Sequence, residues 1–120
     1  MYGLMSQRML GMLEIGQLIT IPFPFSDMKN AKPRPVIVIS LPDDYGDFIC
    51  LAVTSKPQQV NAIAIVQADM QNGTLPLASW VRTDKVYTLN VSIVIKTIGQ
   101  LQQSIFEKVL GLLCSKIGCH

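Results

Sequence analysis

Lys32-Pro33-Arg34-Pro35-Val36-Ile37-Val38-Ile39-Ser40 places an arginine between two prolines, directly before a run of four apolar residues. Each proline fixes its own φ and favours an extended backbone for the residue before it, so the backbone of Arg34 is restricted on both sides. The apolar run is typical of a strand that is buried on both faces. The stretch therefore predicts a strand from about residue 36 to 41 with a rigidly held positive charge at its entrance.

Length and composition indicate one globular domain. The chain has 120 residues, of which 49% are hydrophobic and 15% charged, and no apolar run approaches the ~18 residues of a membrane span, so no membrane partner is expected. A net charge of +2 is too small to indicate a nucleic-acid partner by itself. The three cysteines, Cys50, Cys114 and Cys119, lack CxxC spacing, which favours free thiols in a reducing, cytoplasmic setting.

Short β-rich segments separated by turn signals make up most of the chain. Residues 1–12 are expected to form a flexible N-terminal arm, and residues 13–120 a single domain. Such spacing of short strands predicts a small antiparallel sandwich or barrel. The strands are expected at about residues 16–21, 36–41, 48–53, 61–67 and 78–83, with a further extended segment at 91–98.

The last part of the sequence changes to a helical period. Ile105, Val109 and Leu112 recur at intervals of three and four, which predicts one helix of roughly 14 residues. Ser104 and Glu107 have the spacing of a capping box, and Gly118 stands where a C-terminal cap is expected. Near the other end, Pro22-Phe23-Pro24-Phe25 is expected to stop the first strand from continuing inside a sheet.

The spacing of the aspartates, cysteines and the histidine does not favour a metal site or a histidine-based catalytic site. Asp43, Asp44 and Asp47 lie in a turn-like segment without the alternating ligands of a calcium loop. Cys114, Cys119 and His120 have no fourth ligand nearby, and His120 is the only histidine, so a Ser-His-Asp triad cannot form within one chain. We therefore expect no metal and no cofactor.

Arg34 and the pair Thr54-Ser55 are the remaining candidates for a site. If the strands that carry them pair across the turn at 42–47, the three residues lie at the same end of the sheet. An arginine fork matches phosphate oxygens, and a threonine supplies a hydroxyl donor. The residues alone fit either an anion site or an arginine engaged in a surface ion pair.

Five motifs in one order now point to a known family. The chain resembles the MazF/PemK family of toxin–antitoxin endoribonucleases over about residues 13–118, and the similarity includes the segment 96–101 before the helix. The motifs are Gly16-Gln17-Leu18-Ile19, Pro22-Phe23-Pro24-Phe25-Ser26-Asp27, the stretch 32–40, Ala52-Val53-Thr54-Ser55 and Val81-Arg82-Thr83-Asp84-Lys85.

The resemblance implies a mainly β fold with a C-terminal helix, a small antiparallel barrel of the MazF/CcdB type that is related to the Src-homology-three barrel. It also implies a cytoplasmic homodimer that acts as the growth-inhibiting toxin of a type II toxin–antitoxin system. Such a toxin cuts single-stranded mRNA without a metal, leaving a 2′,3′-cyclic phosphate and a 5′-hydroxyl. Its partner is a small acidic antitoxin, with which it binds DNA. Arg34 and Thr54 match the family's catalytic positions.

Substrate binding is expected around the polar loop before Arg34. Lys29, Lys32 and Lys56 can neutralise phosphates, with Ser55 beside the last of them. Phe25 or Tyr45 can stack a base or pack in the core. Many family members carry a Gly-Ser-Glu segment in this loop, whereas residues 26–31 contain neither Gly nor Glu, which leaves Asp27 as the local carboxylate.

Two other classes of function stay open at this point. One is a non-enzymatic toxin or binding module on the same fold, such as a gyrase poison like CcdB, although that family's C-terminal Trp-Gly-Ile signature is missing from residues 116–120. The other is an inactive domain kept for protein interaction.

Overall fold

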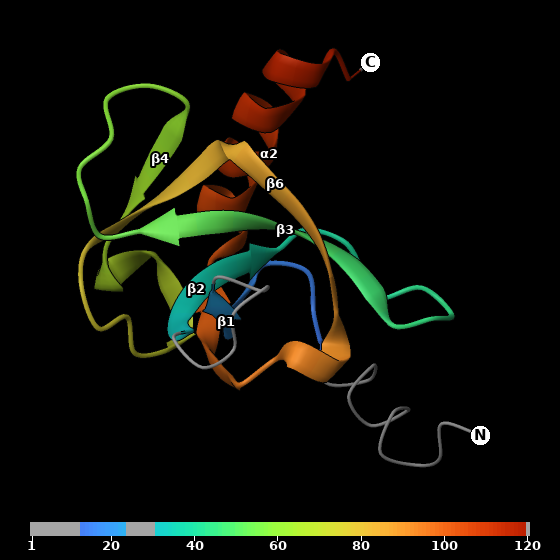
Figure 1. The fold of residues 1–120 in the computed structure, drawn as a ribbon. Helices are drawn as coiled ribbons and strands as arrows, with labels where there is room; N and C mark the ends of the chain where they lie inside the picture. The colour runs from blue at the N-terminus through green and yellow to red at the C-terminus, as the bar shows by residue number, and fades with distance from the viewer. Residues whose placement is uncertain (1–12, 24–30, 120) are drawn as a thin grey trace.

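A computed structural model describes residues 13–23 and 31–119 as one seven-stranded sheet and one long helix (Figure 1). All strand pairs are antiparallel, in the order β4-β6-β3-β2-β1-β7-β5, so the mainly β fold with a C-terminal helix is confirmed. The elements are β1 (Gln17–Phe23), β2 (Lys32–Val38), β3 (Asp47–Thr54), β4 (Ala62–Ile65), β5 (Met70–Gly73), β6 (Ser79–Asn90), β7 (Lys96–Leu101) and α2 (Gln103–Ile117), with short 3-10 turns at Gln67–Asp69 and Val91–Ile93.

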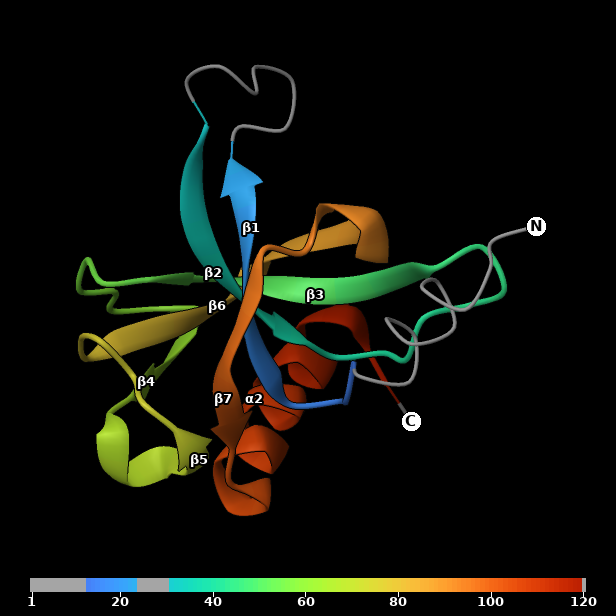
Figure 2. The ribbon, with the colours of Figure 1, turned by 90° about the horizontal axis from the view of Figure 1, so that it is seen from below.

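The curved sheet is a half-barrel with a hydrophobic cluster on each face. Alternation along each strand sends Leu18 and Ile37 to the face covered by α2, and Ile19, Val36 and Val38 to the other face. Figure 2 shows α2 lying across one side of the strands. Because β2 is buried on both faces from Val36 to Val38, the predicted two-sided strand is confirmed, but it ends at Val38 and not at about residue 41 as predicted.

The β1–β2 hairpin extends further than the sequence suggested. β1 continues through Phe23 and β2 begins at Lys32, but beyond Thr20 β1 has a neighbouring strand on one side only, so the prediction that it does not continue as a central strand at Pro22 is confirmed. β7 pairs with β1 only between Gln17 and Thr20, and Pro22 lies opposite Pro33 in a ribbon of two strands. A proline is tolerated there because its missing N–H faces no third strand.

β6 is one bent strand of 12 residues, which is longer than the segment 78–83 predicted. Leu51 of β3 pairs with Val86, whereas the next residue, Ala52, pairs with Arg82, so three residues of β6 form a bulge. Thr83 fixes this bulge, because its N–H and its hydroxyl both donate to the carbonyl of Asn61, at 2.8 and 2.9 Å. The bend is visible at the top of Figure 1.

The C-terminal part of the chain differs in detail from the predictions. The predicted extended segment 91–98 is a 3-10 turn followed by β7, and β5 at Met70–Gly73 was not among the predicted strands. Helix α2 begins after Gln102 without a side-chain cap, so the capping box of Ser104 and Glu107 is wrong. Gly118 does end the helix in the left-handed conformation, with φ 74°. Within residues 13–23 and 31–119, no helix is long and apolar enough to cross a membrane.

Candidate functional site

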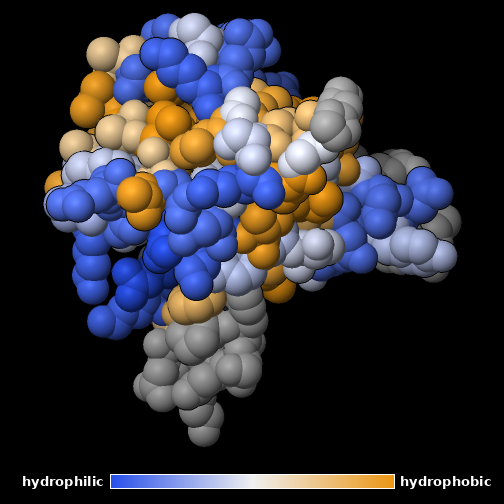
Figure 3. All heavy atoms as spheres, turned by 90° about the horizontal axis from the view of Figure 1, so that it is seen from above, coloured by the Kyte–Doolittle hydropathy of each residue, from blue (hydrophilic) through white to orange (hydrophobic). Residues whose placement is uncertain are grey.

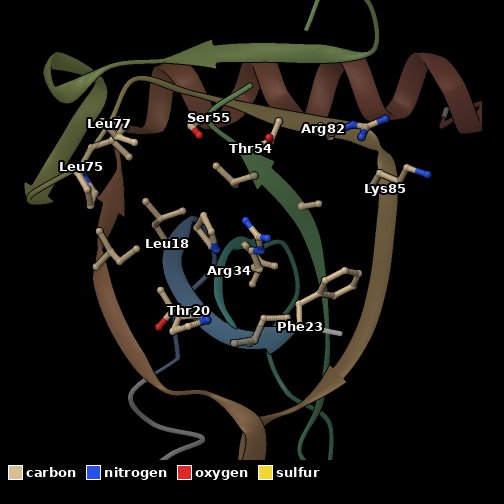
Figure 4. A pocket seen from close by; sticks show the side chains of 18 of the residues that line it. Leu18, Thr20, Phe23, Arg34, Thr54, Ser55, Leu75, Leu77, Arg82 and Lys85 are labelled. Atoms are coloured by element: carbon tan, nitrogen blue, oxygen red, sulfur yellow. The ribbon is translucent and has the colours of Figure 1, made fainter. Parts of the chain in front are cut away.

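Arg34 and Thr54 line one cavity of about 770 Å³. The β2–β3 ladder ends where Val36 pairs with Ala52, and Arg34 and Thr54 each lie two residues beyond that pair, at the same end of the two strands. Figure 4 shows both side chains on the cavity, with Arg34 near its centre. The predicted convergence of these two residues at one end of the sheet is therefore confirmed.

The hydroxyl of Thr54 is oriented by the backbone that follows it. Its Oγ1 accepts a hydrogen bond from the N–H of Lys56 at 3.1 Å. A hydroxyl has one hydrogen to donate, and no acceptor for that hydrogen is present among the described residues. Thr54 can therefore donate to an oxygen of a bound molecule.

The charges on the cavity wall are all positive. Arg34, Lys56, Lys85, Lys96 and Arg82 line it, whereas no Asp or Glu in the described part of the chain does. Long cationic side chains around a partly apolar hollow concentrate anions there. The cavity is therefore suited to a ligand that carries several negative charges.

One of these cations is already neutralised. Arg82 donates from Nε to Oδ1 of Asp84 at 3.1 Å and from a terminal nitrogen to Oδ2 at 2.8 Å. This hydrogen bonding, together with the opposite charges, raises the pKa of Arg82 and lowers the pKa of Asp84. It is the one ion pair within the described residues, so Arg34 is not held in a surface ion pair there.

Apolar side chains form the rest of the wall. Phe23 and Tyr87 lie together on one side, with ring centroids 6.3 Å apart and planes inclined at 54°. Leucine and isoleucine side chains form another part, namely Leu18, Leu75, Leu77 and Ile98. A mostly apolar hollow with a few polar groups is typical of ligand sites.

Of the other predicted site residues, some line the cavity and others do not. Ser55 and Lys56 line the cavity, whereas Lys32 lies on the same strand as Arg34 with an exposed side chain and is not part of the wall. Tyr45 is exposed in the turn between β2 and β3, at the far end of β3 from Thr54, so it does not reach the cavity. The predicted residues Phe25, Asp27 and Lys29 lie outside the described residues.

Sequence reasoning missed Lys85, Lys96 and Tyr87. Both lysines belong to segments already quoted for the family resemblance, and their charge was the available signal. Their meeting at one cavity depends on the bend of β6 and on β7 lying beside β1.

Two predictions about non-catalytic residues can also be assessed. Asp43 accepts hydrogen bonds from the N–H groups of Tyr45 and Asp47, both at 2.9 Å, which confirms the predicted turn. All three cysteines are free, as expected, and burial raises the pKa of the Cys50 thiol to about 12.

Comparison with known proteins extends over nearly the whole chain. Residues 14–117 match the family described as PemK-like, MazF-like toxin of type II toxin–antitoxin system. A search of curated proteins gave no match.

Solved structures share the fold at low sequence identity. The chain is similar to a MazE–MazF structure from Deinococcus radiodurans, with a TM-score of 0.72 and 20% identity over 90% of this chain and 98% of that one. It is also similar to an endoribonuclease in complex with its cognate antitoxin from Mycobacterial species (TM-score 0.70, 16% identity, 88% and 94% covered). The Mycobacterium tuberculosis toxin MazF-mt6 is a third example (TM-score 0.66, 16% identity, 87% and 98% covered).

Proposed function

Because the chain belongs to the family of PemK-like, MazF-like toxins of type II toxin–antitoxin systems, we propose that it is a metal-independent endoribonuclease that cuts single-stranded mRNA. The observation that carries the proposal is the meeting of Arg34 and the donor hydroxyl of Thr54 in a cavity without a described carboxylate. A phosphodiester is the anion that this arrangement fits best.

The reaction proposed is an internal transfer at phosphorus. The ribose 2′-oxygen attacks the adjacent phosphorus, the bond from phosphorus to the 5′-oxygen breaks, and the products carry a 2′,3′-cyclic phosphate and a 5′-hydroxyl. One proton leaves the 2′-hydroxyl and one joins the 5′-oxygen. Negative charge grows on the non-bridging oxygens between these two events, so donors aimed at them lower the barrier.

Arg34 and Thr54 are assigned the role of stabilising the negative charge on the phosphoryl oxygens. An arginine guanidinium remains protonated in proteins, so Arg34 acts as an electrostatic clamp and does not take the proton. Thr54 donates its hydroxyl hydrogen to one phosphoryl oxygen while the N–H of Lys56 holds the oxygen of that hydroxyl. Asp27 is the carboxylate that the sequence offers for proton transfer, and replacing it by asparagine tests that assignment directly.

Partners follow from the same surface. The unpaired cations of the cavity suit an acidic antitoxin that competes with RNA, as well as the RNA itself. The antitoxin complex is proposed to bind DNA.

We also propose that the protein is a cytoplasmic homodimer. Apolar side chains lie among polar ones on the outer surface (Figure 3), and Ile49 and Val86 are exposed on one face of neighbouring strands, at 39% and 48%. Such side chains are the kind that a second copy can cover.

Cleavage of a fluorescent single-stranded RNA in buffer with a chelator tests the proposal. The wild-type protein should give products with 5′-hydroxyl ends, and Arg34→Ala should slow cleavage by about 10²–10³ or more. Arg34→Lys should be intermediate, because it keeps the charge and loses the fork. Lys108→Gln, on the exposed side of α2, is the matched control and should cleave normally. Cleavage by Arg34→Ala at the wild-type rate would overturn the assignment.

A further inference from the structure

Thr20 in β1 carries a buried hydroxyl on the wall of the cavity. Its Oγ1 has no hydrogen-bond partner among the described residues, the residue is 6% exposed, and it lines the cavity (Figure 4). A buried polar group without a partner destabilises a fold, and valine has almost the same shape without the hydroxyl. A threonine at this position is therefore explained if a ligand supplies the missing hydrogen bond.

The side chains beside Thr20 form an apolar slot. Leu18 is two residues earlier on the same strand and therefore on the same face. Ile98 lies at the bulge where the β1–β7 register shifts between Leu18 and Ile19, and bulges re-aim side chains in this way. Leu75 and Leu77, from the loop after β5, complete the cavity wall around this slot.

The loop that carries Leu75 is held firmly against β7. The side chain of Gln67 accepts a hydrogen bond from the N–H of Leu75 at 2.7 Å and donates one to the carbonyl of Gly73 at 3.1 Å. Gly73 and Gly99 face each other across β5 and β7, and a Cβ on either would collide with the backbone of the opposite strand. Only glycine allows this close approach, so the slot is preformed.

The slot lies next to the site of the reacting phosphate. Thr20 pairs with Pro35, the residue after Arg34, and on its other side with Lys96 of β7. Directly paired residues share a face of the sheet, so Thr20 lies on the same face as Lys96, whereas Arg34 pairs with Ile21 on the opposite face. Thr20 and Arg34 meet through the cavity that both line at the end of the sheet, so a ligand that reaches from Arg34 into the slot would extend towards the cation of Lys96.

We propose that this slot binds one nucleobase of the RNA, adjacent to the phosphate held by Arg34, and that the hydroxyl of Thr20 reads the edge of that base. The inference rests on the proposed function, and it assigns to this slot a part of the enzyme's preference for particular RNA sequences. A base fits because its flat faces are apolar and pack on leucine and isoleucine, while its edge carries donors and acceptors that can satisfy a hydroxyl. Lys96 would bind the phosphate on the far side of that nucleotide.

A pair of matched variants separates this role from a structural one. Thr20→Val keeps the shape and removes the hydroxyl, whereas Thr20→Ser keeps the hydroxyl. Thr83→Val is the control, because Thr83 is also buried, at 2% exposure, but its hydroxyl donates to Asn61 at 2.9 Å and it does not line the cavity. Thermal unfolding should show Thr20→Val to be at least as stable as the wild type and Thr83→Val to be less stable.

Selectivity is measured by binding of short RNAs in which one 2′-deoxy nucleotide at the cleavage position prevents reaction, with each base varied in turn. Thr20→Val should lose about tenfold or more of the preference at a single base position, and Thr20→Ser should keep it. Thr83→Val should also keep the base preference, although loosening the β6 bulge that carries Lys85 weakens RNA binding for every sequence alike. A Thr20→Val protein with the wild-type preference at every position would overturn the inference and leave the hydroxyl to a bound water. Failure of the wild type to cleave unmodified RNA would instead overturn the proposed function, because this binding readout does not need cleavage.

Discussion

Replacing Asp84 by asparagine should make RNA binding stronger and more salt-dependent. Asp84 holds the guanidinium of Arg82 in a fork with N–O distances of 3.1 and 2.8 Å, and Arg82 lines the cavity. Asparagine removes the negative charge and releases one more cation to the RNA. For single strands, each phosphate neutralised by the protein contributes about −0.7 to the slope of log K against log salt concentration.

The structure sets the size of the change. The cations Arg34, Lys56, Lys85 and Lys96 predict a slope of about −2.8 for the wild type, and a fifth cation predicts about −3.5 for Asp84→Asn. Between 50 and 200 mM salt, affinity should then fall about 50-fold and about 130-fold respectively. Cations elsewhere on the protein add equally to both slopes, so the difference of about 0.7 is the quantity to measure.

Fluorescence anisotropy with the uncleavable RNA gives both slopes. Asp44→Asn is the matched control, because it changes the net charge equally from an exposed position in the β2–β3 turn. That turn lies at the far end of β3 from Thr54, about 25 Å away at ~3.3 Å per residue. An unchanged slope for Asp84→Asn, or the same change in Asp44→Asn, would refute the reasoning.

The pH dependence of this difference follows from the direction of the Asp84 shift. Arg82 lowers the pKa of Asp84, so the carboxylate stays charged below the pH at which an ordinary aspartate takes up a proton. The contrast between wild type and Asp84→Asn should therefore be constant from pH 8 to 5. The small stability that the pair contributes is present above the unfolded pKa and is lost as pH falls through the lower folded pKa.

Two further predictions concern side chains on β3. Thr54→Val should slow cleavage by about 10²–10³ in single-turnover assays, because one donor to the phosphoryl oxygens is lost, and Thr54→Ser should restore most of the rate. The fold should survive, since only the hydrogen bond from Lys56 is removed, at a cost of about 0.5–1.5 kcal/mol; equal rates for valine and serine would contradict the role. Iodoacetamide at pH 8.5 should label exposed Cys119 and spare Cys50 until the protein unfolds, because burial raises the pKa of Cys50 to about 12. Mass spectrometry that finds both cysteines labelled equally fast would contradict this.

The central pair of the site was predictable because the information is local. Arg34 and Thr54 are joined by a hairpin whose turn residues and buried strands are readable from the sequence, and an antiparallel pair then fixes which residues meet. The apolar run after Pro35 also predicted a strand buried on both faces, and β2 is buried in this way from Val36 to Val38. Predictions of this kind need only strand type and a turn.

The outer cations were not predictable in the same way. Lys85 reaches the cavity because three residues of β6 bulge out against β3, and that bulge is fixed by Asn61, 22 residues earlier than Thr83. Lys96 reaches it because β7 lies beside β1, which depends on the order of the whole sheet. The lack of a hydrogen-bond partner for the Thr20 hydroxyl among the described residues was also not predictable from the sequence, because a buried threonine hydroxyl usually forms a hydrogen bond.

Arg34 lies where the sheet divides, which explains both the cavity and the prolines. β3 pairs with β2 only as far as Val36, and β7 pairs with β1 only as far as Thr20, so beyond these points β1 and β2 continue as a two-stranded ribbon (Figure 2). The missing third strand on either side leaves room for a ligand between Thr54 and Lys96. Such a ribbon is marginally stable by itself, and prolines offset that weakness by restricting the unfolded chain. A fixed charge stabilises a transition state only if it does not have to reorganise, so a stiff backbone at Arg34 suits both the open site and the proposed cleavage chemistry.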